Sequence, residues 1–218
     1  MEQIDVSSVT PFYTFDPLQG VEVTPFLEML NDCYKGIDRL TQLDSECPMI
    51  ATKLSEQGAS FSQGRGDVSW DDATIVFVAL RATEADGAPS EPLERGISIE
   101  RLGRFPMNEG NSIAYLRAHL IPEEPGDEGI QLLAQLDSGL RAESLTHDHL
   151  SIGFGGMILH GWLTSDDVTQ MRTYLEQSLW KVDQNEPLDG GVREIVRHLL
   201  IVLKSAEKRN LGILMRRH

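Results

Sequence analysis

Residues 147–182 read HDHLSIGFGGMILHGWLTSDDVTQMRTYLEQSLWKV and contain two predicted elements in direct succession. Apolar residues alternate with polar or small ones from 149 to 154, which is typical of a half-buried β-strand. The pair Gly155-Gly156 then supplies the positive-φ positions of a tight turn, and a return strand follows it. The stretch therefore predicts a β-hairpin in which Ile152 faces Leu159 on an apolar side.

The opposite side of this hairpin would carry three histidines. In the expected register His149 and His160 fall on one face, and His147 lies one step further along the same strand. Neutral imidazoles that converge from one face can bind zinc or another divalent metal, so these residues are the candidate metal ligands. Ser151 opposite His160 is also a candidate nucleophile with its base. The alternative is a solvated face of ordinary polar residues, and a slip of one residue in the turn would separate the histidines.

A capped helix is predicted directly after the hairpin. Thr164 is a good N-cap, and Asp167 three residues later completes a capping box. Apolar residues then recur at helical spacing on one face at Val168, Met171, Leu175, Leu179 and Val182.

The remaining segments complete an α+β pattern. Strands are expected over 11–15, 74–81, 97–102, 112–121 and 211–215, and helices over 24–44, 49–57 and 192–206. Two sequence signals conflict at 69–85: a capping box predicts a helix there, while the β-branched run Thr74-Ile75-Val76 favours a strand. We expect a mainly antiparallel sheet with three to four helices packed on one face.

Length and composition indicate one domain. A chain of 218 residues with 40% hydrophobic content can bury a substantial core, and we expect a single α+β domain over 1–218 with a possible lobe boundary in the acidic loop 83–96. The first ten residues lack the basic and apolar regions of a signal peptide, and no segment is long and apolar enough to span a bilayer. Two cysteines are too few for a disulfide framework, so the expected location is the cytoplasm.

The charge is large and uneven. The formal net charge is −15; residues 193–218 carry seven basic and two acidic side chains (+5), which leaves 12 basic and 32 acidic side chains in residues 1–192 (−20). Such a field repels nucleic acid and attracts basic proteins. The alternative is that the acidity only keeps the protein soluble.

Motifs of common enzyme classes are missing from the sequence. It has no Walker motif, no G-x-S-x-G, no H-E-x-x-H and no paired-cysteine motif. The segments GWLT (161–164) and LKSAEKRNLGILM (203–215) resemble the bacterial YfbM-like domains of unknown function, and this resemblance implies no activity. The sequence therefore favours an acidic binding protein of the bacterial cytoplasm, of the inhibitor or immunity type, with a basic protein as partner, no cofactor, no nucleic acid and no membrane. The alternative is a metal-dependent hydrolase that uses the three histidines.

Overall fold

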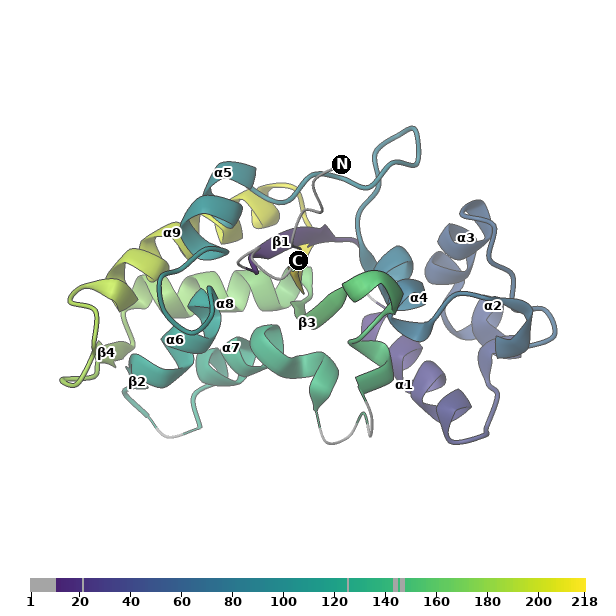
Figure 1. Ribbon diagram of the computed structural model, residues 1–218, viewed down its shortest axis with the longest axis horizontal. Coiled ribbons are helices and arrows are strands. Elements are labelled where there is room, and N and C mark those ends of the chain that lie inside the picture. Colours follow the sequence, from purple (N-terminus) through teal and green to yellow (C-terminus); the bar gives the residue numbers. More distant parts are fainter. Residues whose placement is uncertain (1–10, 21, 125, 143–144, 146–147) are drawn as a thin grey trace, which may run out of the picture.

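The computed structural model describes residues 11–20, 22–124, 126–142, 145 and 148–218. Its centre is a three-stranded sheet of β1 (Tyr13–Leu18), β5 (Gly212–Arg217) and β3 (Ile158–Leu163), in the order β1-β5-β3 and antiparallel throughout. The first and last strands of the chain are therefore direct neighbours in the middle of the molecule (Figure 1). A separate short ribbon pairs β2 (Leu120–Pro122) with β4 (Trp180–Val182).

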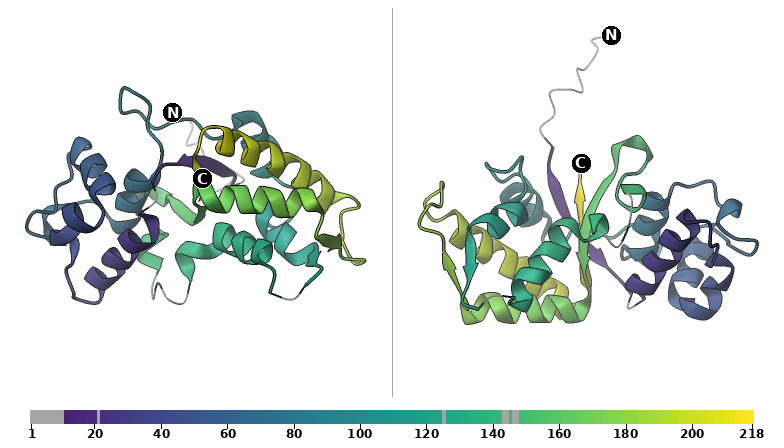
Figure 2. Two further views of the ribbon diagram at one scale, coloured as in Figure 1. Left: turned by 180° about the vertical axis from the view of Figure 1, so that it is seen from behind. Right: turned by 90° about the horizontal axis from the view of Figure 1, so that it is seen from below.

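Both faces of the central sheet are apolar. On β5, Ile213 and Met215 belong to one buried cluster, whereas Leu214 between them belongs to a second cluster. Because neighbouring residues of a strand point to opposite faces, each cluster covers one face. The helices lie on both sides of the sheet, as Figures 1 and 2 show. The expectation of helices on one face is therefore wrong, because it rested on strands with only one apolar side.

Nine α-helices are present in the described part of the chain, not three to four. On one side of the sheet these are α1 (Val23–Tyr34), α2 (Leu43–Glu46), α3 (Pro48–Glu56) and α4 (Asp72–Leu80). The others are α5 (Arg95–Ile97), α6 (Ser112–His119), α7 (Glu128–Ser138), α8 (Ser165–Gln177) and α9 (Gly191–Lys208). Short turns of 3₁₀- or π-helix occur at Leu40–Gln42, Arg65–Asp67, Ser98–Leu102, Gly139–Arg141, Asp148–Leu150 and Phe154–Gly156. The fold is α+β, and none of its described helices is long and apolar enough to cross a membrane.

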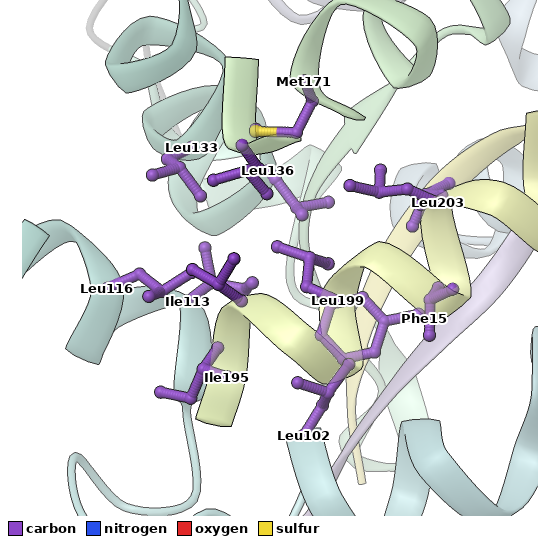
Figure 3. Packing of buried hydrophobic residues seen from close by; sticks show 14 of the residues in the cluster. Phe15, Leu102, Ile113, Leu116, Leu133, Leu136, Met171, Ile195, Leu199 and Leu203 are labelled. Carbon is purple, nitrogen blue, oxygen red and sulfur yellow. The ribbon is translucent and has the colours of Figure 1, made fainter. Parts of the chain in front are cut away.

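Elements with a local signal in the sequence form, although α8 ends at Gln177 and so leaves Leu179 and Val182 of the predicted apolar stripe outside the helix. Thr164 accepts a hydrogen bond from the backbone N–H of Asp167, and the Asp167 carboxylate accepts one from the Thr164 N–H, which together form the predicted capping box of α8. The last helix and the strand after it form as α9 and β5. The apolar stripes of α8 and α9 meet in the cluster that contains Ile213 and Met215, to which Met171, Leu199 and Leu203 belong (Figure 3).

Three predicted strands are wrong. The segments predicted as strands over 74–81 and 112–121 form mainly the helices α4 and α6, and 97–102 forms helical turns. The cap decided the first case, because the Asp71 side chain accepts a hydrogen bond from the Thr74 N–H at 2.9 Å and thereby starts α4. The β-branched residues Ile75 and Val76 of this helix are fully buried, so burial outweighed their strand preference. In α6, Asn111 caps the helix in the same way.

The first predicted helix is shorter than expected. The helix predicted over 24–44 ends at Tyr34, and Gly36 after it adopts a φ of +86°, a left-handed conformation that helix interiors do not use. The acidic loop at 83–96 leads from α4, which packs in one cluster, to Leu93, which packs in the other. Whether these two parts are separate domains stays a prediction.

Candidate functional site

The predicted hairpin forms only in part and with a different register. Ile152 pairs with Ile158 in a single bridge, one residue away from the expected partner Leu159. The start of the expected first strand is replaced by a helical turn at Asp148–Leu150, whereas Gly155 and Gly156 both adopt positive φ as predicted, at 76° and 84°. The pairing of Ile152 with Ile158 is the one-residue slip that changes which side chains share a face.

His149 lies in a polar cluster beside α1 and α4. Its ring stacks on Tyr34 with centroids 4.3 Å apart, and its Nε2 lies 3.8 Å from Asp72 Oδ2. Asp72 is also held by Arg65, whose Nε donates to Oδ1 at 2.6 Å. The Asp72 carboxylate therefore lies between Arg65 and His149 and accepts a hydrogen bond from Arg65.

His160 lies against different elements. It is 7% exposed on β3, its Nδ1 lies 2.9 Å from the Asp137 carbonyl oxygen, and its ring meets Tyr13 edge-on. Because a carbonyl can only accept, Nδ1 carries the proton in this pair. Burial lowers the pKa of His160, so the ring is neutral near pH 7 and links β3 to the end of α7.

His149 and His160 thus have separate surroundings, and His147 lies outside the described residues. Within the described part, no group of three or more His, Cys, Asp or Glu side chains is placed to hold a metal ion. Ser151 is fully buried and its hydroxyl donates to the Asp148 carbonyl, so the nucleophile pair with His160 does not form. The zinc site at His147, His149 and His160 stays a prediction.

The clearest charged concavity is a groove between the start of α7 and the middle of α8. It encloses about 520 Å³ and is bordered by the carboxylates of Glu124, Asp127 and Glu128. Among the described residues that line it there is no Lys, Arg or His. We call this feature the acidic groove; its α8 side consists of Thr169, Gln170, Thr173, Tyr174 and Gln177.

Local structure explains how the acidic groove forms. Asp127 caps α7 by accepting a hydrogen bond from the Gly129 N–H at 2.8 Å, which fixes the start of this helix at the rim. Gly129 packs directly on the Tyr174 ring, because a Cβ at this position would come within 2.2 Å of Tyr174 Cδ1. The absence of a side chain at Gly129 therefore lets α7 and α8 approach closely enough to share the groove.

Tyr174 is the unusual residue of the groove. It is 6% exposed, and its hydroxyl has no hydrogen-bond partner among the described residues. Burial, together with the charges of Asp127 and Glu123, raises its pKa to about 12. The hydroxyl is therefore neutral at physiological pH and retains both a proton to donate and lone pairs to accept.

The excess of acid is not neutralised within the chain. Eight of the 12 basic side chains in residues 1–192 already form ion pairs, and these pairs occupy only a minority of the 32 acidic residues there. Near the groove the described ion pair is Lys181 with Glu123, at 3.9 Å. In the part of the chain that the structure describes, Glu124, Asp127 and Glu128 have no ion-pair partner.

The sequence predicts the acidic side of the groove but not the side formed by α8. The acidic run at 123–128 is visible in the sequence as a segment suited to a basic partner or to solvent. Tyr174 lies more than forty residues further along the chain, and no local pattern connects it with that run.

Comparison of the chain with protein-family models, with curated proteins and with solved structures finds no match.

Proposed function

We propose that this chain is an acidic binding protein for a basic protein partner, of the inhibitor or immunity type and acting in the cytoplasm, and that the acidic groove is the principal contact. One observation carries the proposal, namely three carboxylates without ion-pair partners that border a concavity without a cation in its described lining. A lysine or arginine side chain of the partner would supply the missing charge.

The charge of the whole chain supports the same function. A net charge of −15 steers a basic partner toward the surface and speeds the encounter, whereas the groove provides a place where the charges meet at short range. Long-range attraction of this kind weakens as salt screens it. The affinity for a basic partner is therefore expected to fall as the salt concentration rises.

The test measures fluorescence anisotropy of a labelled octalysine peptide titrated with the full chain at about 50 mM salt, where screening is weak. The variant Glu124→Gln, Asp127→Asn, Glu128→Gln removes the three charges of the acidic groove, and asparagine keeps the capping ability at 127. Exposed ion pairs contribute about 0.5 kcal/mol each, so the variant is expected to bind about tenfold more weakly.

A matched control separates the groove from net charge. The variant Glu84→Gln, Asp86→Asn, Glu94→Gln removes three exposed charges from the loop at 83–96 and leaves the groove intact. We expect it to lose less than threefold in affinity. Equal losses in both triple variants, or no binding of octalysine by the wild type, would contradict the proposal.

A further inference from the structure

A second cavity lies away from the acidic groove. It encloses about 690 Å³ between one face of α1 and the end of α7 with the turn Gly139–Arg141 after it. This volume is in the range of small-molecule sites, which occur preferentially where two parts of a fold meet. The wall from α1 belongs to one buried cluster, whereas α7 packs mainly in the other. We call this cavity the α1–α7 pocket.

The floor of the α1–α7 pocket is apolar. Leu27, Leu145 and Trp162 line it, and each of them is less than a tenth exposed. The Trp162 ring lies under Gly139, where an added Cβ would be 3.1 Å from Cζ3. A flat or aliphatic group that covered this floor would gain the hydrophobic contribution of apolar surface removed from water.

Two cations, Lys35 and Arg141, line the same pocket. Lys35 follows Tyr34 in the sequence, and the Tyr34 ring stacks on His149. Asp148, the residue before His149, lies 3.9 Å from Arg141 Nε. Arg141 is therefore connected through Asp148 and His149 to Tyr34, the last residue of α1. The contact of Arg141 with Asp148 is long for an ion pair, and Lys35 has no ion pair among the described residues.

Two carboxylates, Glu28 and Asp32, also line the pocket. Asp32 accepts a hydrogen bond from Arg39 at 3.0 Å and is already paired. Glu28 precedes Lys35 by seven residues, which is two helical turns or about 10 Å along α1. The pocket therefore combines an apolar floor with two cations in a protein that is strongly acidic.

We propose that the α1–α7 pocket binds a small amphipathic organic anion. Its apolar ring or chain would cover Leu27, Leu145 and Trp162, and its carboxylate or sulfonate would lie between Lys35 and Arg141. This site is independent of the acidic groove, because the two share no lining residue.

The test uses 1-anilinonaphthalene-8-sulfonate, whose fluorescence rises on transfer to an apolar site, and N-phenyl-1-naphthylamine as the same probe without the anionic group. The full chain is expected to bind the sulfonate saturably, and the variant Lys35→Glu, Arg141→Glu to bind it at least tenfold more weakly while it retains the neutral probe. The variant Ala134→Trp, which fills the pocket, is expected to lose both probes. Circular dichroism and thermal unfolding verify that each variant is folded.

The control Arg95→Glu, Arg104→Glu makes the same change in net charge at two exposed residues outside the pocket, and it is expected to leave the affinity unchanged. Equal weakening in this control would overturn the proposal, and so would a loss of less than twofold in the Lys35, Arg141 variant. Unchanged binding to a folded Ala134→Trp variant would overturn it as well. Octalysine binding measured on the same proteins reports separately on the acidic groove.

Discussion

Strand β3 packs closely against α7, and this contact depends on Gly161. A Cβ at position 161 would lie 1.8 Å from the Gln135 carbonyl oxygen and 2.7 Å from that of Leu136. Both atoms belong to the backbone of α7, so no side-chain rotation can relieve the contact. The register shift of β3 against β5 between Leu159 and Gly161 is at the same place. We therefore expect Gly161→Ala to push α7 away from the sheet.

The magnitude follows from the size of this overlap. Extra carbon atoms forced into a packed core typically cost about 1–3 kcal/mol, and a backbone obstacle places Gly161→Ala at the upper end, at about 3 kcal/mol. For a chain of this size each kcal/mol corresponds to about 2–4 °C in melting temperature. The expected decrease is therefore about 6–12 °C.

Urea denaturation and thermal unfolding measure this loss. The control Gly96→Ala places the same methyl group where no atom lies within 4 Å of the added Cβ, and it is expected to leave stability unchanged or slightly higher. A loss of less than about 1 kcal/mol in Gly161→Ala would refute the close packing of α7 on β3. Because α7 also carries Asp127 and Glu128, the same variant is expected to weaken octalysine binding.

Three further predictions concern single side chains. Lys53 donates to the last carbonyl oxygens of α4, and burial lowers its pKa to about 8. The unfolded chain keeps this proton up to the ordinary pKa of 10.5. The free energy of unfolding, measured by urea denaturation, should therefore rise by about 1–2 kcal/mol from pH 8 to 10. A Lys53→Met variant whose free energy of unfolding rises equally with pH would contradict this. Thr164→Ala removes the cap of α8 and should lower the free energy of unfolding by about 1–2 kcal/mol, whereas Ser165→Ala should change it little. Equal losses of stability in the two variants in urea denaturation would argue against the capping box. Tyr174→Phe removes a buried hydroxyl without a partner and should stabilise the fold by about 1 kcal/mol in thermal unfolding, so a clear loss of stability would reveal a hydrogen bond to this group.

Local interactions made parts of this fold predictable. The capping box of Thr164 and Asp167 joins residues three positions apart, so its signal is complete within a few letters of sequence. The apolar stripe of α9 and the strand β5 after it were predictable for the same reason. The acidic balance of residues 1–192 also follows from composition alone and does not depend on the fold.

Tertiary contacts decided the remaining features. At α4 and α6 a cap starts the helix, and burial by surrounding elements outweighs the strand preference of the segment, which the sequence of the segment alone does not show. The register at Ile152 depends on turns whose geometry the two glycines permit but do not specify. A helical turn at Asp148–Leu150 in place of the strand gives His149 different neighbours. The acidic groove likewise needs Tyr174 beside a distant acidic run. The sequence by itself therefore determined the caps, the amphipathic helices and the charge. Only packing between distant segments decided the two-sided sheet, the positions of the histidines and the acidic groove, because contacts between distant segments have no local signal in the sequence.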